Sequence, residues 1–176
     1  RVEAVIDEPA IGRGDLDAAA SDPHPGIELT DAVIGWPGGE PLVEPLSLRV
    51  DAGERVALVG PSGVGKTTVA ATILGLIPPL GGAVASRGRL GYLAQDAHIF
   101  TTSVAENVKI GNRDASADQV TDALARAGLP VDPALAVGEL GSTLSGGEQR
   151  RLAASRLFVG DYQAIILDEP SEHLDP

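Results

Sequence analysis

A Gly-rich stretch near residue 60 has the residue types and spacing of a phosphate-binding loop. Residues 60–67 read GPSGVGKT and fit the pattern G-x-x-x-x-G-K-[ST]. Glycines let backbone N–H groups approach phosphates closely, and the N-terminus of a following helix adds partial positive charge. In this pattern Lys66 contacts the β- and γ-phosphates of ATP or GTP, and the hydroxyl of Thr67 binds Mg²⁺. The predicted nucleotide contacts are Gly60, Pro61, Ser62, Gly63, Val64, Gly65, Lys66, Thr67 and Thr68.

Two acidic residues near the end of the chain are candidates for the metal and the attacking water. Asp168 and Glu169 follow the apolar run 164–167, which reads AIIL and is typical of a central parallel strand. In P-loop ATPases an acid at this place, the Walker-B acid, holds Mg²⁺. A neighbouring carboxylate polarises the water that attacks the phosphate. We therefore predict that Asp168 is a metal ligand and that Glu169 is the catalytic base.

A third motif lies between these two. Residues 144–148 read LSGGE, and Ser145 is a typical N-cap residue. Gly146 and Gly147 would leave backbone N–H groups open above a helix N-terminus, which forms an anion site. An ordinary Ser-capped helix has the same local pattern. The position between a phosphate loop and an acidic strand end favours the phosphate-binding interpretation.

The elements that must position these residues follow from periodicity. Alternating residues predict half-buried strands over 27–29 and 46–50. The β-branched run 55–59 predicts a buried strand that leads into the phosphate loop, and residues 68–74 predict the helix behind it.

Later segments have their own signals. Residues 78–82, which read PPLGG, are expected to break the chain, and 90–93 to form a short strand. Residues 103–158 are expected to be mainly helical. Within them, 117–127 carries apolar residues on one face and stops at Gly128.

Composition excludes several classes of protein. The net charge of −12 argues against a nucleic-acid surface. The absence of Cys excludes disulfides and thiolate metal sites. No stretch reaches the roughly 18 to 20 apolar residues that a transmembrane helix needs.

Over residues 27–176 the chain resembles the nucleotide-binding domain of ABC transporters. Residues 144–148 are similar to the family signature. Gln95 is similar to the Q-loop glutamine, which contacts Mg²⁺ and faces the transmembrane part. Trp36 stands where the family places an aromatic residue that stacks on adenine, although a Trp that only packs in a turn is the alternative. Residues 174–175 are similar to the end of the D-loop.

The resemblance implies an α/β fold, in which a P-loop NTPase core carries a small antiparallel β subdomain and an inserted helical subdomain at about residues 97–158. It implies ATP and Mg²⁺ as ligands and a head-to-tail dimer with a second nucleotide-binding domain, where Ser145, Gly146 and Gly147 complete the partner's site. The implied catalytic residues are Glu169, Lys66 and Gln95, and the implied metal ligands are Thr67, Gln95 and Asp168.

Two stretches are similar to exporters: residues 98–107, after the Q-loop, and residues 137–141, before the signature. In exporters the transmembrane helices precede this domain on the same chain. Residues 1–26 are therefore expected to be a linker from a membrane domain. The implied location is the cytoplasmic face of a bacterial inner membrane.

Some residues depart from the family pattern. Glu148 stands where exporters usually carry Gln, and the D-loop positions hold the bulky Glu172 and His173. This D-loop is similar to that of the heterodimeric cysteine and glutathione exporters of cytochrome bd assembly. The family's switch histidine lies beyond the D-loop, so the domain is expected to be C-terminally truncated at Pro176, with His173 a polar residue at the dimer face.

Three functional hypotheses stay open from the sequence. The leading hypothesis is an ATPase domain that powers an exporter through ATP-driven dimerisation. The second is an ATP-gated binding module with little turnover, which the intact Glu169 argues against. The third is a soluble ABC-type ATPase of DNA repair or translation, which the acidic charge argues against.

Overall fold

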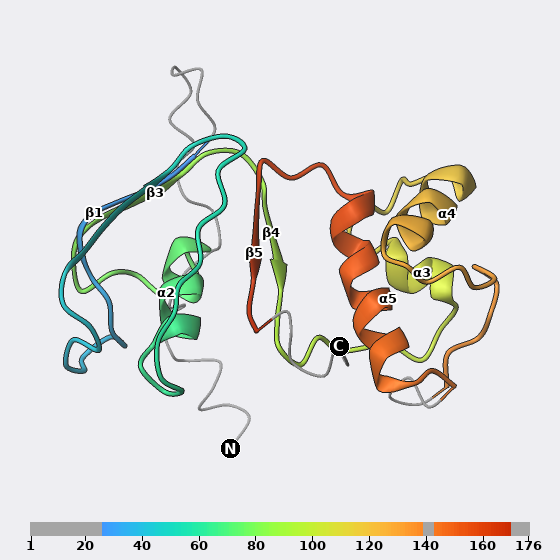
Figure 1. The fold of residues 1–176 in the computed structure, drawn as a ribbon, viewed down its shortest axis with the longest axis horizontal. Helices are drawn as coiled ribbons and strands as arrows, with labels where there is room; N and C mark the ends of the chain where they lie inside the picture. The colour runs from blue at the N-terminus through green and yellow to red at the C-terminus, as the bar shows by residue number, and fades with distance from the viewer. Residues whose placement is uncertain (1–25, 139–142, 170–176) are drawn as a thin grey trace, which may run out of the picture. The chain divides into compact units, whose positions relative to one another are not determined.

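Two structural units make up the chain in the computed structural model, which describes residues 26–138 and 143–169 (Figure 1). One unit runs up to Leu90 and the other begins at Gly91. The first unit contains β1 (Ile27–Val33), β2 (Leu46–Val50), α2 (Lys66–Ile73) and β3 (Gly81–Ser86). Next come β4 (Leu90–Leu93), α3 (Val104–Val108), α4 (Ala117–Arg126), α5 (Gly146–Val159) and β5 (Ala164–Leu167).

The sheet of the first unit has the strand order β2-β1-β3, and both pairs are antiparallel. Leu29 on the central strand lies opposite Leu48 on one side and Val84 on the other. The predicted antiparallel sheet is therefore confirmed. Its third strand was missed, because the sequence analysis placed a chain break at 78–82. The short, Gly-rich segment of β3 takes strand geometry through its pairing with β1.

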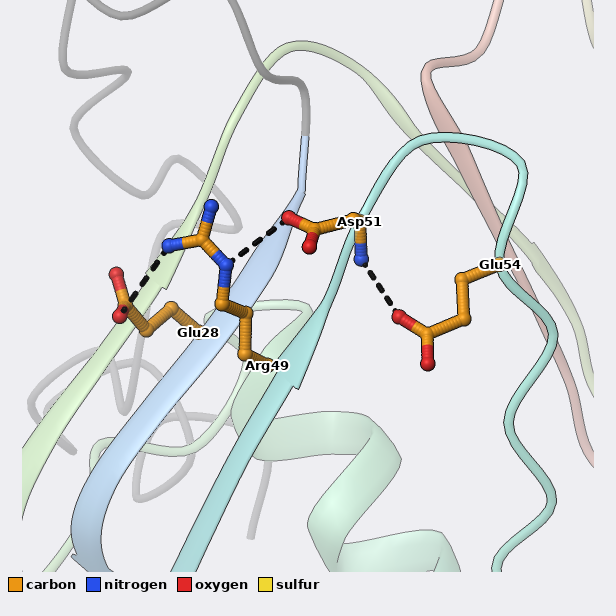
Figure 2. Close-up of polar contacts among 4 residues, drawn as sticks. All are labelled: Glu28, Arg49, Asp51 and Glu54. Atoms are coloured by element: carbon orange, nitrogen blue, oxygen red, sulfur yellow. Dashed lines mark hydrogen bonds and ion pairs between the residues drawn. The ribbon is translucent and has the colours of Figure 1, made fainter.

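The turn after β2 is held by polar contacts on the surface of this sheet. Figure 2 shows Arg49 between two carboxylates, with Nε 3.0 Å from Asp51 and Nη1 3.8 Å from Glu28. The backbone N–H of Asp51 donates to the Glu54 carboxylate at 3.0 Å. About half of each Arg49 and Asp51 side chain is exposed, so these ion pairs contribute little energy and mainly shape the turn.

The prediction of a strand over 55–59 is wrong. In the structure these residues have no regular secondary structure, and Val59 is 90% exposed. A β-branched run forms a strand only where neighbouring strands supply hydrogen bonds and a surface to pack on. Among the described residues of the first unit, the three paired strands do not include this segment.

The predicted helix after the phosphate loop is confirmed as α2, which begins at Lys66, two residues earlier than predicted. Its buried side chains include Val69, Ala70 and Ile73. The core residue Ile34 is fully buried in the same unit. Burial of these apolar side chains stabilises the position of α2, which begins at the end of the phosphate loop.

The regular elements found between residues 103 and 158 are the helices α3, α4 and α5, as predicted. α4 begins with a capping box between Ser116 and Gln119 and ends before Gly128, whose φ of 69° favours glycine. On its inner face Val120 and Leu124 are buried, in a core that also includes Leu152 of α5.

The strand over 164–167 is confirmed as β5, which pairs with β4 in a two-stranded sheet; the two arrows point the same way in Figure 1. The prediction that it is buried like a central strand is wrong, because Ile165 is 46% and Leu167 is 48% exposed. Within the described part of this unit the sheet has only these two strands, so β5 has no second neighbouring strand there. No helix in the described residues is long and apolar enough to cross a membrane.

Candidate functional site

The phosphate loop folds around its own lysine. Lys66 Nζ donates to the carbonyl oxygens of Gly60 at 3.1 Å and Pro61 at 3.0 Å. Gly63 and Gly65 have φ values of 78° and 107°, a region that L side chains rarely adopt. These contacts hold the ammonium group beside the curled backbone. A loop of this shape presents N–H groups to an anion.

Within the described residues, the N-terminus of α2 has no side-chain cap that would compete with a phosphate. Its N-cap is Gly65, no side chain caps it, and its first turn contains no acidic residue. The first N–H groups of a helix need partners, and the helix dipole favours a negative one. Thr67 is exposed at this end, whereas Thr68 is buried, so Thr68 would contribute through its backbone.

Trp36 follows β1 in the same unit as the phosphate loop, and its side chain is 54% exposed. Its carbonyl oxygen accepts a hydrogen bond from Gly39 at 2.9 Å, which closes the predicted turn. An exposed indole on an ordered turn has a face available for stacking. The adenine-stacking role therefore stays a prediction that this position permits.

Asp168 lies directly after β5 and is largely buried. Its N–H donates to the Leu93 carbonyl at 2.9 Å, and Tyr92 donates its hydroxyl to Asp168 Oδ2 at 3.3 Å. Burial, together with the charge of Asp168, raises the pKa of Tyr92. The sequence analysis missed Tyr92. A tyrosine directly before the last residue of β4 gave no signal in the sequence, because its contact with Asp168 depends on the pairing of β4 with β5.

Glu169 has a φ of 49°, in the left-handed region, which is unusual for a residue with a side chain. Its carbonyl oxygen accepts a hydrogen bond from Arg150 of α5. Arg150 was also missed by the sequence analysis. This contact joins the helix of the signature motif to the backbone of Glu169, the predicted catalytic residue.

Gln95 is exposed and lies two residues after β4, while Asp168 directly follows β5. Because β4 and β5 are neighbours and the Asp168 N–H bonds to Leu93, the structure brings the predicted metal ligands Gln95 and Asp168 to one edge of the sheet. Parallel strands of α/β proteins carry ligand sites at this edge.

The signature motif forms the start of α5. Ser145 Oγ accepts a hydrogen bond from the Glu148 N–H at 3.3 Å, and Ser145 donates to Glu148 Oε2 from both N and Oγ at 2.8 Å. The hydrogen bond from the Ser145 backbone is the main cause that lowers the pKa of Glu148. Among the described residues, a Cβ on Gly146 would meet no atom within 4 Å.

The predicted residues fall into two groups that the structure describes separately. Trp36 and the phosphate loop 60–67 belong to the first unit, and Gln95, Asp168 and the signature 144–148 to the second. Residues 139–142 and the D-loop residues 172–175, with His173, lie outside the described residues.

The chemistry of the donor set fits Mg²⁺ bound together with a nucleotide. Mg²⁺ in nucleotide sites uses one or two carboxylates together with phosphate oxygens and water. The described residues contain no cluster of three or more His, Cys, Asp or Glu that would hold a metal alone. The buried Asp168, with one carboxylate oxygen on Tyr92, supplies a single hard oxygen ligand of the required type.

Comparisons with known proteins agree on one family. The profile of the ABC transporter family matches residues 43–172. The chain is 32% identical to the mycobactin import ATP-binding/permease protein IrtB of Mycolicibacterium smegmatis over 99% of this chain and 34% of that protein. It is 34% identical to the ATP-dependent lipid A-core flippase of Chromobacterium violaceum over 99% of this chain and 33% of the flippase.

A solved structure of a bacterial Atm1-family ABC exporter with ATP bound superposes with a TM-score of 0.84 at 27% identity, over 98% of this chain and 34% of that one. The predicted fold class is thus confirmed. The chain spans about a third of the length of the relatives that it matches. The chain therefore belongs to the ABC transporter family, as an ATP-binding ATPase domain.

Proposed function

We propose that this domain binds ATP with Mg²⁺ and closes head to tail on a second nucleotide-binding domain, and that the closure powers transport by a membrane domain of the same full-length protein. The observation that carries the proposal is the presence of two phosphate-type sites on one chain. The loop 60–67 holds its lysine in place, and α5 begins with Gly146 behind the N-cap Ser145, where a Cβ would meet none of the described residues within 4 Å. A single nucleotide needs one such loop, so the second site is explained by the nucleotide of another domain.

Within the first unit the loop amides bind the phosphates, and Lys66 places positive charge where charge develops on the transferred phosphoryl group. Lys66 is already held by two carbonyl oxygens, so it needs little rearrangement during the reaction. Trp36 binds the adenine ring through stacking.

In the second unit Glu169 accepts the proton of the attacking water. The sequence motifs assign Thr67, Gln95 and Asp168 to Mg²⁺. When bound, the ion neutralises charge on the phosphate oxygens. Tyr92 keeps the Asp168 carboxylate oriented through its hydrogen bond at 3.3 Å.

The alternative functions have less support. The relatives whose names describe a permease carry ATP-binding and membrane parts on one chain, which favours a transporter over a soluble ATPase of DNA repair or translation. The net charge of −12 also disfavours nucleic acid as a partner. A module with little turnover would not need Glu169. The finer assignment to cysteine and glutathione exporters rests on the D-loop alone.

A substitution at Gly146 tests the composite site. A Cβ there would meet none of the described residues within 4 Å, and an acidic residue suits the first turn of a helix, so the fold should tolerate Gly146→Asp. Its charge would repel the partner's phosphates. In the full-length protein in lipid nanodiscs, we expect phosphate release to fall by roughly 10²-fold, the cost of losing one donor in such a site. ATP binding to the phosphate loop should remain.

Gly146→Ala is the matched control, because it adds the Cβ without the charge; we expect its turnover to stay within severalfold of the unchanged protein. If Gly146→Asp hydrolysed ATP at the rate of the control, the signature would not contact a nucleotide and the proposed composite site would be refuted.

A further inference from the structure

Asn107 of α3 is a buried polar residue to which the mechanism above gives no role. Its side chain is completely buried. Nδ2 donates to the carbonyl oxygens of Phe100 at 3.0 Å and Ser103 at 3.1 Å. Oδ1 accepts from the Phe100 N–H at 3.0 Å and from Arg156 Nη2 at 2.9 Å. All four hydrogen-bonding positions of the amide are therefore occupied.

The fourth of these bonds comes from α5. Arg156 reaches Asn107 twice, because its Nε also donates to the Asn107 backbone carbonyl at 3.1 Å. Burial lowers the pKa of this guanidinium, yet an arginine stays charged in proteins. Two bonds from a planar guanidinium fix both distance and orientation.

The loop on the other side of Asn107 presents an aromatic side chain to solvent. Phe100 is 48% exposed, although both of its backbone polar groups are bound to Asn107. Its ring meets His98 edge to face at a centroid distance of 4.7 Å, and the Arg156 guanidinium lies 5.9 Å from its centroid. The exposed ring is thus held by contacts on several sides.

We propose that Asn107 and Arg156 are positioning residues that make the loop 99–103 and α5 move as one rigid piece. A fully satisfied buried polar network specifies a single geometry, because each broken bond leaves an unpaired polar group in a low-dielectric interior. A displacement of the loop therefore displaces α5, which carries the signature residues Ser145 to Gly147 at its start. The inference rests on the proposed function, in which those residues contact the nucleotide of a second domain.

Two substitutions each remove part of the hydrogen bonding that connects the loop 99–103 to α5. Arg156→Gln removes the guanidinium from α5 but leaves the Asn107 bonds to Phe100 and Ser103. Asn107→Asp keeps an acceptor oxygen for Arg156 but removes both donations to the loop. Either change should separate the motion of the loop from that of α5. A residue that only stabilises the core would alter unfolding without separating the two motions.

The measurement is amide hydrogen exchange by mass spectrometry on the full-length protein with and without Mg²⁺·ATP. The protein carries Glu169→Gln, so that the nucleotide-bound state persists. Without further substitutions, we expect ATP to slow exchange in both 143–148 and 99–103, each on the order of tenfold. In Arg156→Gln and in Asn107→Asp, the response of 143–148 should persist and that of 99–103 should shrink to less than about twofold.

The matched control is Arg126→Gln on α4. Arg126 also lies over a Phe ring, at 4.8 Å from the Phe158 centroid, and donates to a carbonyl oxygen, but it does not contact Asn107. It should leave both responses intact. If one of the two variants, Arg156→Gln or Asn107→Asp, does not fold, the other still tests the connection between the loop and α5. A thermal melt shows which variant folds.

Two results would overturn the inference. One is that ATP slows hydrogen exchange in 99–103 as strongly in folded Arg156→Gln or Asn107→Asp as without these substitutions. The other is that, without these substitutions, ATP slows exchange in 143–148 but not in 99–103. A protein in which ATP changes neither segment would instead contradict the proposed composite site.

Discussion

Replacing Lys66 by alanine removes the positive charge that the phosphate loop holds beside its own backbone. In the structure this ammonium lies 3.1 Å from the Gly60 oxygen and 3.0 Å from the Pro61 oxygen. These two hydrogen bonds orient it beside the loop backbone. The charge should act on the transition state of phosphoryl transfer at full strength, because no rearrangement is needed when the reaction begins.

Two estimates of the effect agree. A unit charge about 4 Å from a phosphate oxygen, at an effective dielectric constant of about 20, contributes about 4 kcal/mol. Deleting one preorganised donor from an enzyme costs about 2.7–4 kcal/mol. At about 1.4 kcal/mol per factor of ten, Lys66→Ala should lower turnover by roughly 10²–10³. The two exposed hydrogen bonds to the loop carbonyls add only about 1 kcal/mol each to folding, so the protein should still fold.

The assay is phosphate release by the full-length protein in lipid nanodiscs at saturating Mg²⁺·ATP, with the melting temperature measured alongside. Lys109→Ala is the matched control, because Lys109 is the other lysine of the chain and ends α3, away from the phosphate loop in sequence. We expect the control to keep its turnover. A Lys66→Ala protein with turnover within tenfold of the unchanged protein would refute the role assigned to this lysine.

Two further predictions concern Glu169, the predicted catalytic base, and Trp36, the predicted adenine contact. Glu169→Gln should still bind ATP but release almost no phosphate at this site, because an amide cannot accept the proton of the attacking water; unchanged single-turnover hydrolysis would show that another group is the base. Trp36 is the only tryptophan of the chain, so its fluorescence reports directly on its surroundings, and it should change when ATP is titrated to millimolar concentrations. A constant signal would favour the alternative of a Trp that only packs in its turn.

The local geometry of the predicted phosphate-binding motifs was readable from the sequence because their physics is local. A positive φ at Gly63 and Gly65, and a hydroxyl at the N-cap Ser145, are requirements of single positions. The helix α4 was readable for the same reason, since its cap, its apolar face and its final glycine lie within a dozen residues. Elements of this kind need no distant partner to take their shape.

For the strands, residue types within a short segment did not predict the structure. The run 55–59 has strong β-branched character, yet it is exposed and irregular in the structure, while the Gly-rich β3 is a paired strand. A strand depends on hydrogen bonds to a neighbour that is remote in sequence, and residue type alone does not supply that neighbour.

The same limit applies to the residues around the catalytic groups. Tyr92 meets Asp168 across 76 positions of sequence, and Arg156 meets Asn107 across 49. None of these pairs has a spacing that marks it in the sequence. The sequence by itself supplied the predictions of which residues handle phosphate and metal. Only tertiary packing decided which neighbours orient them, because burial and long-range hydrogen bonds exist only once the chain has folded.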